Sequence, residues 1–214
     1  MNTLVDIVLV FLLLANLALL GSSRLVLCIR VAAVQGIALG LMPLLLPEHE
    51  IAFRTIFLVI GAVALKGLVF PWMLFRALRA AAVRHELEPF VGYSASLMFG
   101  VTALGVSLWL AGRLSPPTPL LSPLILPAAL FTVLIGLFLI VARKKALMQV
   151  VGYLAMENGI YLFGITLARE QPLVVELGVL LDVFVAVFVM GIAIFHISRE
   201  FDHIDVDQLT VLKD

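Results

Sequence analysis

The chain has 214 residues, of which 63% are hydrophobic and 13% charged, and its 14 basic and 14 acidic residues cancel. Ordinary soluble domains are about 45–50% apolar, so this excess excludes a soluble enzyme domain, a nucleic-acid-binding domain and a disordered chain. A membrane-spanning helix takes about 20 apolar residues, and the composition therefore accommodates about seven of them. We predict an all-α membrane protein.

Apolar runs with few charges, separated by short polar or proline-containing joints, predict seven transmembrane helices. The first run has no basic segment ahead of it, so it is expected to be a retained span rather than a cleaved signal. In chain order the predicted helices cover Thr3–Leu20, Leu25–Leu46, Ile51–Leu78, Gly92–Ala111, Leu124–Ala142, Ala146–Leu167 and Leu173–Ile197.

The charges in the joints predict how the chain is oriented in the membrane. The first, third and fifth joints are basic, as is the start of the C-terminal tail at Arg199. Of the even joints, the second is acidic, the fourth has only Arg113, and the sixth pairs Arg169 with Glu170. Because Lys and Arg gather on the cytoplasmic side, we expect the N-terminus outside and the C-terminus in the cytoplasm. That arrangement requires an odd number of spans, in agreement with seven.

A proline-rich loop at residues 116–123 divides the predicted helices into two groups. A four-helix membrane part (1–115) precedes it, and a three-helix membrane part (124–198) with a cytoplasmic tail (199–214) follows. Stiff proline-rich loops join separate units well, although this one could equally be a plain surface loop. Within the second predicted helix, the Gly36-x-x-x-Gly40 spacing favours close helix packing.

Three charged residues lie near the middle of predicted spans: Lys66, Glu157 and Asp182. A charge at the centre of a membrane helix costs about 2.5–3.5 kcal/mol, so three of them cost roughly 8–10 kcal/mol unless they face one another or water. Glu157 lies about 16 Å into the sixth span and Asp182 about 14 Å into the seventh. Both depths reach the middle of a hydrocarbon core about 30 Å thick, so the two carboxyl groups are candidates for a proton relay.

Polar residues near these charges favour a hydrated interior. Asn158 adjoins Glu157, and Pro71 is expected to leave the Gly67 carbonyl near Lys66 without its helical hydrogen bond. Such freed carbonyls line ion pathways in membranes. At four-residue spacing, one face of the sixth predicted helix carries Gln149, Tyr153, Glu157 and Tyr161.

A structural role is the alternative for each charged residue. Glu157 and Asp182 could only hydrogen-bond neighbouring helices, and the long Lys66 side chain could extend toward the membrane surface. The charges nearer the span ends, Arg30, Arg54 and Glu176, are interpreted as interfacial or subunit-pairing. Cys28 is the only cysteine and the four histidines lack ligand spacing, so we expect no metal, cofactor or catalytic residue in this chain.

The segments Met156-Glu157-Asn158-Gly159, Glu176-Leu177-Gly178 and Asp182 with Ala186–Met190 carry a family resemblance. Over nearly its full length the chain resembles component E of hydrogenase-4, a membrane subunit of energy-converting hydrogenases related to respiratory complex I. From about Leu124 onward it is similar to the three-helix K subunit of complex I. By this resemblance, Glu157 and Asp182 correspond to two buried relay glutamates, with aspartate replacing the second. Lys66 has no counterpart in the K subunit.

The resemblance implies a non-catalytic subunit in a complex of the formate hydrogenlyase type, in the bacterial cytoplasmic (inner) membrane. Glu157 and Asp182 would relay protons and Lys66 would tune them, supported by Tyr153, Tyr161, Asn158 and Gln149. Expected partners are antiporter-like membrane subunits, a complex I H-subunit-like membrane anchor and a hydrogenase peripheral arm that holds the nickel–iron centre and iron–sulfur clusters. Two alternatives stay open, a subunit of a multi-subunit cation/proton antiporter and a purely structural spacer of the membrane arm.

Overall fold

A computed structural model describes residues 3–45, 53–80, 91–114 and 121–167. This part of the chain consists of helices and short joints, without a strand. The elements are α1 (Thr3–Gly21), α2 (Leu25–Gly40), α3 (Met42–Leu45), α4 (Phe53–Ala64), the π-helical turn η1 (Leu65–Val69), α5 (Phe70–Ala80), α6 (Tyr93–Ala111), α7 (Ile125–Ala142) and α8 (Ala146–Leu167).

The structure confirms the predicted all-α membrane fold. In the described residues, five helical stretches are long and apolar enough to cross a membrane. α8 has 22 residues and is not among these five stretches. The second predicted helix is broken at Leu41, between α2 and α3. The seventh predicted span (Leu173–Ile197) and the tail lie outside the described residues, so the number of spans and their orientation remain predictions.

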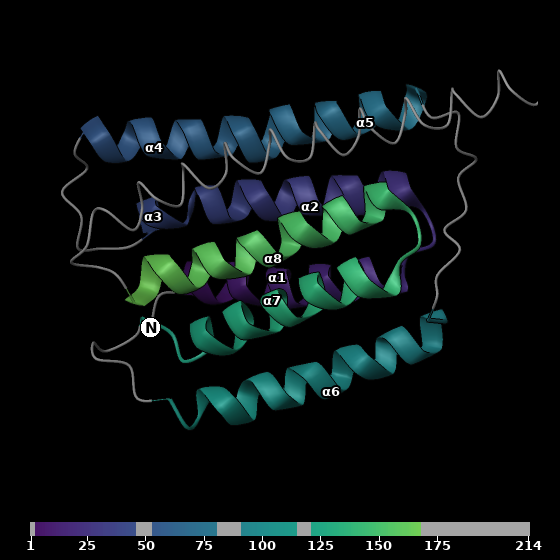
Figure 1. The fold of residues 1–214 in the computed structure, drawn as a ribbon. Coiled ribbons are helices and arrows are strands. Elements are labelled where there is room, and N and C mark those ends of the chain that lie inside the picture. The colour runs from purple at the N-terminus through teal and green to yellow at the C-terminus, as the bar shows by residue number, and fades with distance from the viewer. Residues whose placement is uncertain (1–2, 46–52, 81–90, 115–120, 168–214) are drawn as a thin grey trace, which may run out of the picture.

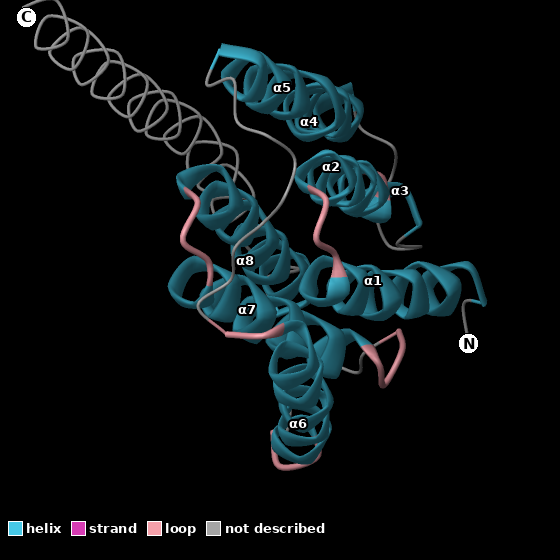
Figure 2. Cartoon of the chain, turned by 90° about the vertical axis from the view of Figure 1, so that its right-hand side faces the viewer, coloured by secondary structure: helices cyan, strands magenta, loops and turns pink. Residues whose placement is uncertain are grey.

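The helices lie side by side in a bundle with α4–α5 at one edge and α6 at the other (Figure 1). Seen end-on, α2 lies beneath α4–α5, and the α7–α8 pair adjoins both α1 and α2 (Figure 2). The N-terminal helices therefore pack directly on the C-terminal hairpin. α2 contacts α8, and α1 contacts α7.

Glycine allows α7 and α8 to approach until their backbones touch. A Cβ atom on Gly136 would overlap the Met156 backbone nitrogen. One on Gly152 would lie 2.9 Å from the Gly136 carbonyl oxygen, and one on Gly159 would lie 2.7 Å from the Val133 nitrogen. Small residues bring membrane helices into close contact in this way, and here they fix the position of the residues that α8 carries.

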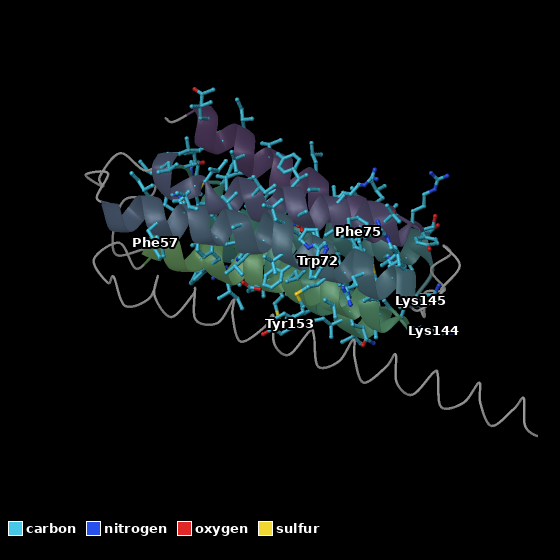
Figure 3. All side chains as sticks on the ribbon, turned by 90° about the horizontal axis from the view of Figure 1, so that it is seen from above. Phe57, Trp72, Phe75, Lys144, Lys145 and Tyr153 are labelled. Carbon is cyan, nitrogen blue, oxygen red and sulfur yellow. The ribbon has the colours of Figure 1, made fainter. Side chains whose placement is uncertain are left out.

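The joint between α7 and α8 buries one of its three basic residues. The side chain of Arg143 is only 1% exposed, its Nη2 donates to the Leu20 carbonyl at 2.7 Å, and its guanidinium lies 5.2 Å from the Tyr93 ring centre. Burial lowers the pKa of Arg143 from its ordinary value, and the interaction with Tyr93 opposes that shift. The other two basic residues of this joint, Lys144 and Lys145, lie at one end of the bundle, and Phe57 lies at the other end (Figure 3).

Candidate functional site

Lys66 lies in the π-helical turn η1, between α4 and α5. Instead of a regular helical bond, the Phe70 amide donates to the Leu65 carbonyl, five residues earlier. The following residue, Pro71, explains the change, because its ring would clash with the carbonyl four residues before it and it has no N–H to donate. Local π-helical adjustment is one way in which membrane helices accommodate proline. The sequence predicted that Pro71 removes a helical hydrogen bond here, but it did not predict a π-helical turn.

Two glycines of α2 allow the helix that carries Lys66 to pack closely against α2. A Cβ atom on Gly36 would lie 2.6 Å from the Lys66 Cβ, and one on Gly40 would lie 3.0 Å from a methyl group of Val63. This agrees with the close packing predicted from the Gly36–Gly40 spacing. The stem of Lys66 is thus held against the backbone of α2, and the residue is only 5% exposed.

The Lys66 ammonium meets the Glu157 carboxylate of α8 inside the bundle. Its Nζ lies 2.9 Å from Glu157 Oε1, and Glu157 is 3% exposed. Neither carboxylate oxygen has a hydrogen-bond partner of good geometry within the described part of the chain. The contact is therefore mainly electrostatic, and each charge compensates the other in surroundings where an unpaired charge is costly.

Two further α8 residues surround the ammonium. Lys66 Nζ donates to Asn158 Oδ1 at 3.4 Å and lies 4.8 Å from the centre of the Tyr161 ring. Both contacts suit a cation, because an amide oxygen and the face of an aromatic ring are electron-rich. The ammonium thus has partners other than Glu157 within a small movement of its flexible stem.

A small cavity adjoins the ion pair. It measures about 10 Å³, close to the ~10–15 Å³ that one water molecule needs. Its polar lining comes from Lys66, Glu157 and Asn158, and its other walls are formed by apolar residues of α2, α5 and α8. A water in this space would have the polar partners that a buried water requires.

Two other predicted residues of α8, Gln149 and Tyr153, have their described contacts elsewhere. Gln149 donates to the Arg143 carbonyl at 3.0 Å, at the start of α8. Tyr153, which is also on α8 (Figure 3), packs against an apolar cluster at the centre of the bundle. Asp182 lies outside the described residues. The structure therefore brings together Lys66, Glu157, Asn158 and Tyr161 from the predicted set.

A second buried polar group was not predicted from the sequence. Asn16 of α1 donates to Thr132 Oγ1 of α7 at 2.8 Å and accepts from Gln35 Nε2 of α2 at 3.0 Å. All three residues are fully buried. Gln35 immediately precedes Gly36, so this hydrogen-bonded row also fixes the helix against which Lys66 rests. The sequence signal that could have revealed this group is the presence of polar residues inside otherwise apolar helices.

The described residues contain no group of three or more His, Cys, Asp or Glu side chains that could hold a metal ion. Within the described part of the chain, the buried site instead brings together one ammonium, one carboxylate, one amide and one phenol ring. Such a set can hold and exchange protons.

Comparison with known proteins gives one match along the whole chain and others along part of it. The chain is 37% identical over 218 residues to the uncharacterized protein Rv0085 of Mycobacterium tuberculosis, covering 100% of this chain and 97% of that protein. The family described as NADH-ubiquinone/plastoquinone oxidoreductase chain 4L matches residues 124–214. No solved structure matches the chain significantly.

Hydrogenase-4 component E of Escherichia coli K12 is 41% identical over 88 residues, which is 41% of each chain, and the values for the Shigella flexneri protein are the same.

Proposed function

This chain belongs to the same family as Rv0085 and carries an oxidoreductase chain 4L domain over residues 124–214, and we propose that it is a membrane subunit of a complex I-like complex. The similarity to hydrogenase-4 component E supports this proposal and favours a hydrogenase of the formate hydrogenlyase type. In that complex the chain is a non-catalytic subunit of the bacterial inner membrane. The nickel–iron centre and iron–sulfur clusters belong to partner subunits, and antiporter-like subunits and an H-subunit-like anchor lie beside it in the membrane.

We further propose that Glu157 carries protons along the membrane arm and that Lys66 controls its charge. The observation that carries this proposal is the 2.9 Å approach of Lys66 Nζ to Glu157 Oε1 inside the bundle. With the ammonium at this distance, the carboxylate is held in its charged form. When the ammonium moves toward Asn158 and Tyr161, the carboxylate loses its counter-charge and takes up a proton, because desolvation disfavours an isolated charge.

Glu157 releases its proton by the same steps in reverse. Return of the ammonium stabilises the carboxylate, and the proton leaves through the water-sized cavity toward the next acceptor. Asp182 of the seventh predicted span is the proposed acceptor. Redox chemistry in the partner subunits would drive the ammonium between its two positions.

The test is the Glu157→Gln variant, which keeps the size of the side chain but cannot ionise. The complex is purified through a tag on this chain and its subunits are identified by mass spectrometry. Redox turnover and proton uptake are then measured in membrane vesicles. We expect an assembled complex, because the glutamine oxygen can still accept a hydrogen bond from the Lys66 ammonium, with lowered proton uptake per turnover. Wild-type coupling would refute the relay, and loss of the complex would favour the structural spacer.

The same purification separates hydrogenase from antiporter. Nickel–iron hydrogenase subunits and hydrogen-dependent dye reduction in the tagged preparation are the expected result. Antiporter subunits recovered without hydrogenase would favour the multi-subunit cation/proton antiporter.

A further inference from the structure

The surroundings of the Lys66 ammonium are those of a small cation site. A carboxylate oxygen lies 2.9 Å from Nζ, an amide oxygen lies 3.4 Å away, and an aromatic ring centre lies 4.8 Å away. Carboxylate and amide oxygens are also the ligands that hard metal cations take in proteins. The position that a bound metal cation would occupy is therefore filled by a cation tethered to the chain.

The fold restrains the ammonium from leaving this position entirely. The Lys66 Cβ is pressed against Gly36 of α2, and the π-helical turn ahead of Pro71 sets the direction of the side chain. The adjoining cavity has room for about one water. A hydrated sodium ion needs more space than this, and a dehydrated one would face the repulsion of the nearby ammonium.

We propose that Lys66 is a specificity-determining residue that makes the Glu157 site accept protons and reject sodium. A proton adds to the carboxylate without needing a cluster of oxygen ligands, so the carboxylate can take one up when the ammonium shifts toward Asn158 and Tyr161. Sodium needs the oxygens that the ammonium already occupies. This inference rests on the proposed role of Glu157 and names the ion that the site carries.

The test uses the whole complex, purified through a tag on this chain and reconstituted into lipid nanodiscs and vesicles. Binding of radioactive sodium and the sodium dependence of turnover are measured for the wild type and for Lys66→Ala. We expect wild-type turnover and proton uptake to be independent of sodium. Lys66→Ala should bind additional sodium, and its turnover should rise as the sodium concentration is raised.

Three control variants identify the site. Lys66→Arg keeps the positive charge and should remain insensitive to sodium, whereas Lys66→Ala combined with Glu157→Gln should lose the additional sodium binding. Lys144→Ala removes an exposed lysine of the α7–α8 joint and should bind sodium as the wild type does. If Lys66→Ala does not assemble, Lys66→Gln takes its place, since it removes the charge but retains most of the stem.

Sodium-dependent proton uptake in the wild type would overturn the inference, as would a Lys66→Ala or Lys66→Gln complex without additional sodium binding. These outcomes are distinct from failure of the relay itself. The relay is judged from proton uptake per turnover in Glu157→Gln, whereas ion selectivity is judged from sodium binding and sodium dependence.

Discussion

The ammonium of Lys66 and the carboxylate of Glu157 lie 2.9 Å apart inside the bundle although the two residues are far apart in the sequence. Lys66 belongs to the helices that precede residue 124, and Glu157 to the segment, residues 124–214, that matches the chain 4L family. The ion pair therefore joins the two parts of the chain at the point where we propose that protons pass.

Lys66→Met should lower the amount of assembled protein, because it leaves the Glu157 carboxylate buried without its counter-charge. Removing one partner of a buried ion pair costs about 3–5 kcal/mol. The double variant Lys66→Met with Glu157→Gln should recover most of the yield but not proton coupling. Quantitative immunoblots and proton uptake in vesicles measure the two effects, and a double variant no better expressed than Lys66→Met would contradict the pairing.

Gly36→Ala should displace Lys66 and lower both stability and coupled turnover. The new Cβ would lie 2.6 Å from the Lys66 Cβ, and this carbon cannot move without the helix backbone. Overpacking of this kind costs about 1–3 kcal/mol. Gly61→Ala is the matched control, since a Cβ at Gly61 meets nothing within 4 Å. Thermal unfolding of the purified protein should separate the two variants, and equal melting temperatures would argue against the tight contact.

Gly136→Ala should separate α7 from α8 and disrupt the hairpin more severely, because its new Cβ meets the backbone of α8 rather than a side chain. We expect loss of folded protein on size-exclusion chromatography in detergent. Gly105→Ala in α6 serves as the control, since a Cβ there meets nothing within 4 Å. A monodisperse Gly136→Ala protein of wild-type stability would show that the helices are not in backbone contact.

Thr132→Val should destabilise the bundle by roughly 0.6–1.7 kcal/mol, the range for one side-chain hydrogen bond inside a membrane. The substitution leaves Asn16 Nδ2 without the acceptor that lies 2.8 Å away in the wild type. Thr132→Ser retains the oxygen and should restore most of the stability. Thr102→Val is the control, because the exposed Thr102 hydroxyl donates only to the Met98 carbonyl of its own helix. Equal melting temperatures for Thr132→Val and Thr132→Ser would count against the hydrogen bond.

The central positions of Lys66 and Glu157 could be predicted from the sequence, because charges inside apolar runs are conspicuous and helix geometry gives their depth. Whether the two residues face each other was left open, since the sequence does not show how the helices are rotated. The prediction of one continuous polar face on α8 agrees less well with the structure. Steps of four residues turn by about 40° more than one full helical turn, so Gln149 and Tyr161 are about 120° apart around the axis. This drift explains why Gln149 bonds to the α7–α8 joint while Tyr161 approaches Lys66.

Other features depend on contacts that the sequence does not encode locally. Asn16 and Gln35 carry no charge, so their burial was not evident until α1, α2 and α7 were seen together. Pro71 indicated a disturbed helix, but a kink or a lost hydrogen bond would have been equally consistent with it. Arg143 lies in a joint for which the sequence analysis gives only the basic charge, and it is buried because the Leu20 carbonyl and the Tyr93 ring lie against it.

The separation of Lys66 and Glu157 along the chain also constrains biogenesis. Synthesis runs from the N-terminus, so the helix that carries Lys66 enters the bilayer before α8 has been translated. Among the five long apolar stretches its mean hydropathy, 1.5, is the lowest, and its lysine then has no carboxylate partner from α8. The ion pair can close only after translation has passed Glu157. Insertion of this span and its final packing are therefore separate events, and any factor that shields a lone lysine in the translocon would act in the interval between them.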